Sequence, residues 1–273
     1  TLCFEDALAI HPAPEAKKIA VVGGGPAGMQ AAVVAARRGH EVTLFEKRKL
    51  GGLLHEASMP EFKADIRNAL AYLTTQVGKA GVHVVNKTAQ IEDLAGFDGV
   101  ILAAGANPVT LPLPGADAPK VQLAVDILNE KAAAVRGNIV VIGGGLIGTE
   151  TAVHLGLQEG NRVTIVEMLP QIMKDCSDCD HIVYTQMIQE HQIQVMTSAR
   201  VAEITEEGVV VEKNGRQTIA ADHVLVAVGL KPNRALYDQL KEAGVKVIAV
   251  GDCGKVGKIY DAIHSGYKAG LKI

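Results

Sequence analysis

The sequence has few cysteines, little net charge and no uninterrupted apolar segment of membrane-spanning length. Four cysteines, Cys3, Cys176, Cys179 and Cys253, are too few for a disulfide-stabilised scaffold, and we expect a cytoplasmic protein. A formal net charge of −3 gives no electrostatic reason to bind nucleic acid or an anionic membrane, so we expect neither partner. The longest apolar run, residues 19–36, contains glycines and a proline, which fit a turn and a helix better than a membrane span.

What is present is the composition of an ordinary globular protein, with 48% hydrophobic and 21% charged residues. Its 273 residues exceed the usual length of one compact domain, so we expect two. The first residue is not methionine, and the start lacks the pattern of a signal peptide. The sequence leaves open whether the chain is a fragment of a longer enzyme, and it leaves the oligomeric state open as well.

Short apolar runs of strand length alternate with helical patterns from residue 18 onward. We expect strands at 19–22, 42–45, 82–85, 100–104, 139–142, 163–166 and 247–250. We expect helices at 29–38, 61–79, up to about 157 after the second glycine cluster, and from about 259. This alternation predicts buried parallel sheets.

The chain contains an internal repeat, because the pattern of strand, glycine turn, helix and strand occurs twice. The proline-rich segment 106–115 and residues 229–233 are the expected crossings between domains. We therefore predict an α/β chain of two Rossmann-like domains, the second inserted in the first. The first comprises 18–108 plus 231–273, the second 109–230, and 1–17 form a lead-in that either packs on the protein or hangs free.

The first glycine turn matches G-x-G-x-x-G between a strand and a helix, and Glu46 ends the next strand. Gly23 suits a tight turn, Gly25 the close approach of a pyrophosphate, and Gly28 close packing of helix on strand. The helix amino end then binds the diphosphate. Glu46 can accept hydrogen bonds from ribose hydroxyls, so we expect a dinucleotide here.

The second turn repeats this pattern, with Glu167 as the strand-end acid. Its expected cofactor-binding residues are Gly143, Gly145, Leu146, Ile147 and Gly148. A carboxylate at Glu167 repels the 2'-phosphate of NADPH, and no arginine follows it closely, which favours NADH.

These motifs resemble the glutathione reductase type of flavin- and pyridine-nucleotide-dependent oxidoreductases. VVGGGPAGMQAA is similar to their FAD motif, ILAAGANP and VLVAVGLKPN to their two domain-closing motifs, and VIAVGDC to their late G-D motif. The run RRGHEVTLFEKRKLGGLL is most similar to the carboxyl-terminal half of 2,4-dienoyl-CoA reductase, trimethylamine dehydrogenase and old-yellow-enzyme-like NADH:flavin oxidoreductases.

That resemblance implies an FAD-dependent module that passes reducing equivalents from NADH to another redox centre. In those relatives this centre is an amino-terminal barrel with FMN and a 4Fe-4S cluster, and a separate redox partner is the alternative. Trimethylamine dehydrogenase holds ADP where its relatives hold FAD, so the resemblance leaves open a structural or regulatory module with ADP or no flavin at the first site.

The resemblance also implies further cofactor-binding residues, with the chemistry supplied by the cofactors rather than by a catalytic side chain or a metal. Asp252 would accept a ribityl hydroxyl, and Ile263 would bring a helix amino end to the flavin. The full first-site set is Gly23, Gly25, Pro26, Ala27, Gly28, Glu46, Lys47, Gly52, Leu53, Ala104, Gly105, Gly251, Asp252 and Ile263, and Gly229 lies at the second crossing.

The sequence departs from this family at the redox disulfide. No cysteine lies near the first glycine turn, and Cys176 and Cys179 follow Glu167 in the second domain. We interpret them as surface or partly buried cysteines, with a redox pair or a metal site as alternatives. Cys3 can be compared with the last cluster ligand of the longer relatives, but the asparagine-proline that follows that ligand is missing here, so a cluster role is not favoured. Cys253 is expected to pack beside Asp252. His264 is interpreted as a helix-start or packing residue rather than a proton relay.

Overall fold

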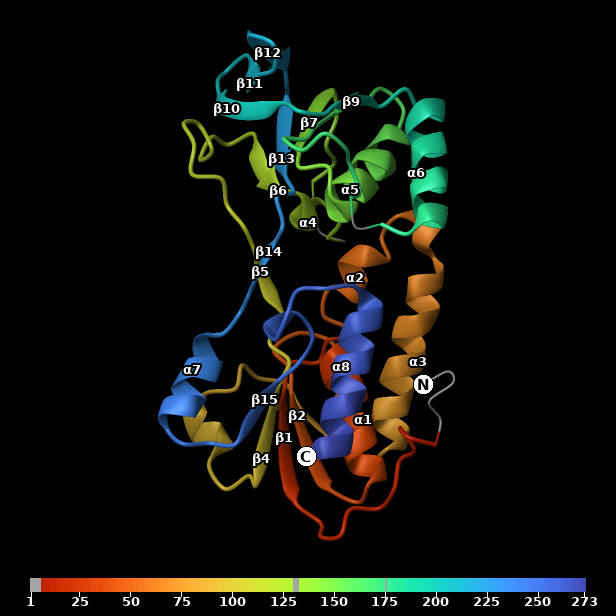
Figure 1. The fold of residues 1–273 in the computed structure, drawn as a ribbon, viewed down its shortest axis with the longest axis vertical. Coiled ribbons are helices and arrows are strands. Elements are labelled where there is room, and N and C mark those ends of the chain that lie inside the picture. The colour runs from red at the N-terminus through yellow and green to blue at the C-terminus, as the bar shows by residue number, and fades with distance from the viewer. Residues whose placement is uncertain (1–5, 130–132, 175) are drawn as a thin grey trace. The chain divides into compact units, whose positions relative to one another are not determined.

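The computed structural model describes residues 6–129, 133–174 and 176–273, and its chain divides into two compact units (Figure 1). The first unit comprises Thr1–Ser58, Ala64–Asn107 and Lys231–Ile273, and the second Met59–Lys63 and Pro108–Leu230. The chain leaves the first unit at β5 (Ala106–Pro108) and returns at β14 (Leu230–Pro232), and these two short strands pair with each other.

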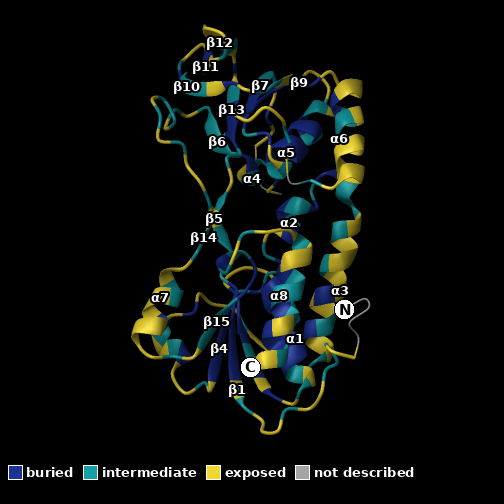
Figure 2. Ribbon diagram, viewed as in Figure 1, coloured by how far each residue is buried: buried dark blue, intermediate teal, exposed yellow. Residues whose placement is uncertain are grey.

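The first unit is built on a five-stranded parallel sheet of order β15-β4-β1-β2-β3. Its strands are β1 (Lys18–Val22), β2 (Glu41–Phe45), β3 (His83–Val85), β4 (Gly99–Leu102) and β15 (Val247–Ala249). Its helices are α1 (Pro26–Arg37), α2 (Leu54–Ala57), α3 (Asp65–Lys79), α7 (Ala235–Glu242) and α8 (Ile259–Lys272), with short 3-10 turns at Ile91–Leu94 and Gly251–Cys253. The central strands β1 and β4 are almost wholly buried (Figure 2), which explains their continuous apolar sequences.

The second unit repeats this architecture with a parallel sheet of order β6-β13-β7-β8-β9. Its strands are β6 (Val121–Leu123), β7 (Asn138–Ile142), β8 (Arg162–Val166), β9 (Gln194–Met196) and β13 (His223–Val226). Its helices are α4 (Ala124–Ile127), α5 (Leu146–Gly156) and α6 (Asp178–Glu190). An antiparallel sheet, β10 (Arg200–Ile204), β11 (Gly208–Glu212) and β12 (Arg216–Ala220), adds a second apolar core.

The lead-in packs on the first unit over its described residues. The Tyr267 hydroxyl donates to the Leu8 carbonyl at 2.6 Å, and the Lys17 ammonium donates to the Ile273 carbonyl at 3.0 Å. The Ala13 N–H donates to the Arg38 carbonyl at 2.8 Å. The end of α8 and the segment before β1 are therefore held together.

Two features differ from the sequence expectations. The helix expected over 61–79 begins only at Asp65, because Glu61–Lys63 form a 3-10 turn that belongs to the second unit. The antiparallel sheet β10–β12 was not anticipated, although its hairpin between β11 and β12 turns at Asn214 and Gly215. Both turn residues have positive φ, +52° and +119°, as an Asn-Gly hairpin turn requires.

Helices α1 and α8 approach so closely that a glycine is required between them. A Cβ added to Gly266 would overlap the backbone carbonyl of Ala27 in α1, and one added to Gly270 would lie 2.7 Å from the Cβ of Val34. Gly78, near the end of α3, has nothing within 4 Å of the position of an added Cβ. Helix packing therefore requires glycine at position 266, whereas no neighbouring atom requires it at position 78.

We predict that Gly266→Ala destabilises the protein by about 1–3 kcal/mol through overpacking. The control, Gly78→Ala, is expected to stabilise it by up to about 1 kcal/mol through helix propensity. Urea denaturation of the two variants measures both effects. Equal stabilities for the two variants would contradict the described packing of α1 on α8.

Candidate dinucleotide sites

The first glycine turn connects β1 to α1 and contains two glycines that packing demands. Gly23 has φ +104°, and a Cβ there would overlap the Ala103 carbonyl at the end of β4. A Cβ on Gly28 would overlap the Gly23 carbonyl. These contacts explain why the turn and the helix lie tightly on the sheet.

Gly25 differs from both, because its added Cβ would meet only the Gly52 Cα at 3.9 Å. Its φ of −72° and ψ of −178° are open to any residue. Neither backbone strain nor protein packing therefore requires glycine at this position. A ligand that approaches the backbone is the physical reason that remains.

The amino end of α1 is open to an anion. Gly25 is the N-cap and supplies no side-chain cap, Pro26 occupies the first helical position, and the first turn has no acidic residue. The terminal N–H groups and the helix dipole therefore face the turn without a side-chain acceptor. Gly52, with φ +56°, lies directly beside this end, since its added Cβ would be 2.9 Å from the Gly25 Cα.

Glu46 fixes the turn through its carboxylate. Its side chain is 8% exposed, its Oε2 accepts the Gly24 N–H at 2.6 Å, and its Oε1 accepts the Arg48 N–H at 2.7 Å. The Gly24 carbonyl in turn accepts the Gly51 N–H at 2.8 Å. Each carboxylate oxygen has a further lone pair, so Glu46 can still accept from a ribose hydroxyl.

The second unit repeats this arrangement. Gly143 has φ +106° and its added Cβ would overlap the Ala227 carbonyl, while one on Gly148 would overlap the Gly143 carbonyl. Gly145 caps α5 without a side-chain cap, and nothing lies within 4 Å of its added Cβ. Leu146 and Ile147 open the helix.

Glu167 has the same hydrogen-bonding role as Glu46. It is 8% exposed, its Oε2 accepts the Gly144 N–H at 2.6 Å, and its Oε1 accepts the Leu169 N–H at 2.8 Å. The Gly144 carbonyl accepts the Met173 N–H at 2.7 Å. Sequence reasoning identified both acids but not that each of them binds the backbone of its own glycine turn.

The remaining first-unit residues occupy the end of β15 and the start of α8. The Gly251 N–H donates to Ser265 Oγ at 2.9 Å, and Asp252 Oδ1 accepts the Gly257 N–H at 3.0 Å. Burial raises the pKa of Asp252 from its ordinary 3.8, the Gly257 hydrogen bond lowers it, and nearby Asp261 raises it further. Ile263 lies in the second turn of α8, so the helix amino end is formed by the residues before it.

The other predicted residues lie at loops and crossings. Leu53 is the N-cap of α2 and is 37% exposed, and Lys47 is exposed beside Glu46. Ala104 and Gly105 follow β4, where the Gly105 carbonyl accepts the Asn233 N–H at 3.0 Å. The Gly229 carbonyl accepts the Val109 N–H at 3.0 Å. Gly105 and Gly229 therefore hold the crossing segments.

A buried polar network in the second unit was missed. Glu150 in α5 accepts the Tyr184 hydroxyl at 2.8 Å through Oε1 and pairs with the Lys63 ammonium at 2.6 Å through Oε2. Phe62 packs edge-on against Tyr184, with ring centroids 6.0 Å apart. Burial and the Glu150 carboxylate raise the pKa of the Tyr184 hydroxyl, which keeps it a donor. Only the pairing in space reveals this set.

The three described cysteines form no disulfide with one another, and each has its own surroundings. Cys253 is fully buried and its thiol donates to the Asn233 carbonyl at 3.0 Å, Cys179 is exposed, and Cys176 is half-buried. Cys3 lies outside the described residues. His264 stacks on Tyr260, with ring centroids 4.0 Å apart.

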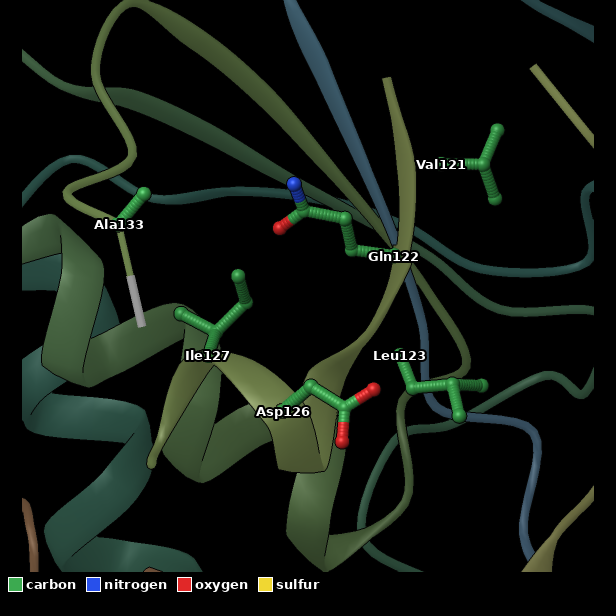
Figure 3. Close-up of a pocket in the computed structure, with 6 residues that line it drawn as sticks. All are labelled: Val121, Gln122, Leu123, Asp126, Ile127 and Ala133. Atoms are coloured by element: carbon green, nitrogen blue, oxygen red, sulfur yellow. The ribbon is translucent and has the colours of Figure 1, made fainter. Parts of the chain in front are cut away.

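The described residues show no metal-binding cluster, no membrane-spanning helix and a pocket that no residue of the glycine turns lines. No group of three or more metal-ligating side chains converges among them, and none of their helices has the length and apolar character to cross a bilayer. A pocket of about 440 Å³ in the second unit involves β6 and α4 (Figure 3). Its lining residues are Val121, Gln122, Leu123, Asp126, Ile127 and Ala133, and none of the predicted site residues is among them.

Residues 17–258, which contain both copies of the strand, glycine turn, helix and acid, match the family of pyridine nucleotide-disulphide oxidoreductases. The chain belongs to this family. Membership accounts for the two Rossmann-like units and for the likeness to the FAD- and NAD-binding half of dienoyl-CoA-reductase-like enzymes.

Curated members of this oxidoreductase family extend the likeness over nearly the whole chain. Bilirubin reductase of Mediterraneibacter gnavus is 40% identical over 272 residues, and NADH oxidase of Thermoanaerobacter brockii is 42% identical over 274 residues. Each match covers 97% of this chain and 42% of the relative. A solved 2-naphthoyl-CoA reductase complex superposes with a TM-score of 0.92 at 32% identity, over 99% of this chain and 42% of that one.

The chain thus spans less than half the length of these relatives. They are oxidoreductases, and the chain is an oxidoreductase of the same family. Each of these relatives therefore contains a further part that the match does not cover.

The raised pKa of Asp252 makes the stability of the folded protein depend on pH. The folded protein holds this proton more tightly than the unfolded chain, so Asp252 reduces stability as pH rises above 3.8 through its raised pKa. Asp252→Asn keeps an oxygen that can accept the Gly257 N–H and removes the charge. We expect the variant, without nucleotide, to have a higher Tm than the unaltered protein at pH 7 and the same Tm at low pH. A lower Tm at pH 7 would contradict this account.

Proposed function

We propose that this chain is an FAD-binding, NADH-oxidising module that passes reducing equivalents to a separate redox centre. One observation carries the proposal: in each glycine turn an added Cβ would collide with neighbouring atoms at three of the four glycines, and the remaining one, Gly25 or Gly145, is required by nothing in the protein. The space that each of these two leaves at an uncapped helix amino end suits the pyrophosphate of a dinucleotide.

The first unit suits FAD for three reasons. Gly25 and Gly52 leave the end of α1 accessible, the buried Glu46 can accept from the adenosine ribose, and Asp252 at the end of β15 can accept from a ribityl hydroxyl. When bound, FAD supplies the group that accepts a hydride and passes electrons on. The residues of this chain bind and orient it.

The second unit suits NADH rather than NADPH. Gly145 and the open end of α5 take the pyrophosphate, and Glu167 takes the ribose. The Glu167 carboxylate carries the same sign of charge as a 2'-phosphate and repels it. The segment after it, Met168–Pro170, contains no basic residue.

The acceptor is proposed to lie outside this chain. The described cysteines lie far along the sequence from the first glycine turn, and the relatives are more than twice as long as this chain. An FMN and iron-sulfur barrel, as an additional domain or a separate partner, suits this role. A cytoplasmic location fits the sparse cysteines.

The alternative is a module that holds ADP or no flavin at the first site. Gly52 beside Gly25, and Asp252 after the carboxyl end of β15, disfavour it, because ADP has no need of ribityl and flavin contacts. Mass spectrometry of the nucleotide released from the purified protein distinguishes FAD from ADP.

Gly25 provides the first test. We predict that Gly25→Val abolishes FAD retention while leaving circular dichroism and Tm close to those of the unaltered protein, because the side chain occupies only the ligand's space. The control Gly28→Val is expected to prevent folding, since its side chain would overlap the Gly23 carbonyl. Unchanged flavin content in Gly25→Val would refute the site.

Glu167 provides a second test. Glu167→Ala should weaken NADH use by about 1–3 kcal/mol, the loss of a charge-assisted hydrogen-bond pair. Glu46→Ala is the matched control, because it removes the equivalent bonds in the first unit and should lower FAD retention without raising the KM for NADH. Equal kinetics with NADH and NADPH in the unaltered protein would contradict the proposed preference.

The third test concerns the missing acceptor. We expect the FAD-loaded protein to reduce ferricyanide or dichlorophenolindophenol with NADH, and the Cys176→Ser, Cys179→Ser double variant to do so equally well. An added FMN-containing barrel partner should restore directed turnover. If the double variant kept FAD but lost dye reduction under reducing conditions, the thiols would have to be electron carriers.

A further inference from the structure

Arg38, the C-cap of helix α1, holds the lead-in and the end of α8 together. Its carbonyl accepts the Ala13 N–H at 2.8 Å, and its Nε donates to the His11 carbonyl at 3.3 Å. Its Nη1 donates to the Gly270 carbonyl at 3.1 Å and to the Leu271 carbonyl. One guanidinium therefore serves both the lead-in and the unpaired carbonyls at the end of α8.

His40, two residues after Arg38, is a buried histidine that contacts the last residue of the lead-in. It is 6% exposed, and its Nδ1 accepts the Lys17 N–H at 3.2 Å. Nδ1 therefore carries no proton, and the proton of the neutral ring lies on Nε2. Nε2 is buried and has no hydrogen-bond partner among the described residues. The ring can thus accept from Lys17 only while it is neutral.

The charged side chains that act on His40 are Arg38, from the end of α1, and Lys17, from the lead-in, and both are cations. The next residue, Glu41, is exposed, and its N–H donates to the Lys17 carbonyl at 2.9 Å. The Lys17 ammonium donates to the Ile273 carbonyl at 3.0 Å, so the end of α8 already has two cationic donors. Burial lowers the pKa of His40 from its ordinary 6.5, and Arg38 and Lys17 lower it further.

We propose that the neutral His40 ring attaches the lead-in to the first unit and that protonation of this ring in acid loosens the attachment. When Nδ1 takes a proton it becomes a donor, so the Lys17 N–H loses its acceptor and faces another N–H. The ring also gains a positive charge beside the Arg38 guanidinium and the Lys17 ammonium, which repel it. The attached form therefore favours the neutral ring, and the detached form, in which water reaches the ring, accepts the proton.

The direction of the pH dependence follows from the two forms. In the detached form His40 is hydrated and has its ordinary pKa of 6.5, whereas in the attached form its pKa is lower. Between these two values only the detached form binds the proton, so detachment becomes more frequent by up to about tenfold for each unit that the pH falls. Below the lowered pKa both forms are protonated and the dependence levels off.

This inference goes beyond the NADH-oxidising role and requires no bound nucleotide. It concerns the carboxyl end of α1, whereas the glycine turn of the first unit lies at the amino end of the same helix. It makes the lead-in a segment whose attachment to the first unit depends on pH.

Two NMR measurements on the full chain test the proposal. The ring nitrogen shifts of His40 at pH 7 are expected to show the tautomer with its proton on Nε2. Amide exchange, corrected for the intrinsic effect of pH, is expected to show that the protection of the Lys17 N–H falls by up to about tenfold per unit between pH 7 and about pH 5. The Gly23 N–H, which donates to the Phe45 carbonyl at 2.8 Å in the same unit, should keep its protection.

Two variants separate His40 from other titrating groups. His40→Asn offers Oδ1 as an acceptor close to the position of Nδ1 and cannot take up a proton in this range. The protection of the Lys17 N–H should therefore no longer depend on pH. The matched control, His83→Asn, changes an exposed histidine of β3 and should leave the pH dependence as it is in the unaltered protein.

Three results would overturn the proposal. One is a His40 that titrates at or above 6.5, as a hydrated histidine does. Another is a protection of the Lys17 N–H that stays constant between pH 7 and about pH 5. The third is a His40→Asn variant that keeps the pH dependence, and if this variant does not fold, the first two measurements decide. None of these readouts uses NADH or FAD, so a failure here is distinguishable from a failure of the proposed cofactor sites.

Discussion

The hydrogen bond that the second glycine of each turn donates to a strand-end carboxylate is the interaction on which both candidate sites depend. Glu46 holds the Gly24 N–H at 2.6 Å, and Glu167 holds the Gly144 N–H at 2.6 Å. Both acids are nearly buried, and each also accepts an N–H from the loop that follows it. A buried carboxylate satisfied by two backbone donors is a strong constraint, and it aligns the turn with the adjacent strand.

The same glycine makes a second backbone hydrogen bond in each unit. The carbonyl of the same glycine accepts an N–H from the returning loop, that of Gly51 in one unit and Met173 in the other. The loop places Leu50 or Ile172 against that glycine, where an added Cβ would collide with the side chain. The helix end beside Gly25 or Gly145 has no side-chain cap, while the glycine turn and the returning loop next to it are held by hydrogen bonds. This preorganisation suits a cofactor that must be held in one orientation.

The sequence predicted the fold class and the parallel character of both sheets because glycine turns and β-branched runs leave strong periodic signals. It could not predict that Glu61–Lys63 leave the α3 helix, because the cause is a long-range ion pair between Lys63 and Glu150. The β11–β12 hairpin could have been predicted from the sequence, because Asn214 and Gly215 form a dipeptide that favours hairpin turns. The last helix, expected from about residue 259, begins at Ile259, and Ile263 lies inside it.

The same comparison separates the site residues that sequence could assign from those it could not. Gly23 and Gly25 look alike in the sequence, and only the positions of neighbouring atoms show that one serves packing and the other leaves room for a ligand. The double use of Glu46 and Glu167, as acceptors for their own turns and as candidate ribose acceptors, likewise depends on geometry that no local pattern encodes. The glycine motif therefore predicts where a dinucleotide site lies, and the packing around each glycine distinguishes the glycines that the fold requires from the one that leaves room for a ligand.

An anaerobic titration with NADH tests the central claim most directly. The purified chain is reconstituted with FAD, freed of excess nucleotide, and titrated while the visible absorbance of the flavin is followed. The account predicts that FAD stays bound and that its absorbance is bleached by NADH in near-equal amount, with much less effect from NADPH. A chain that retains no flavin, or whose bound flavin is not bleached by NADH, would contradict it.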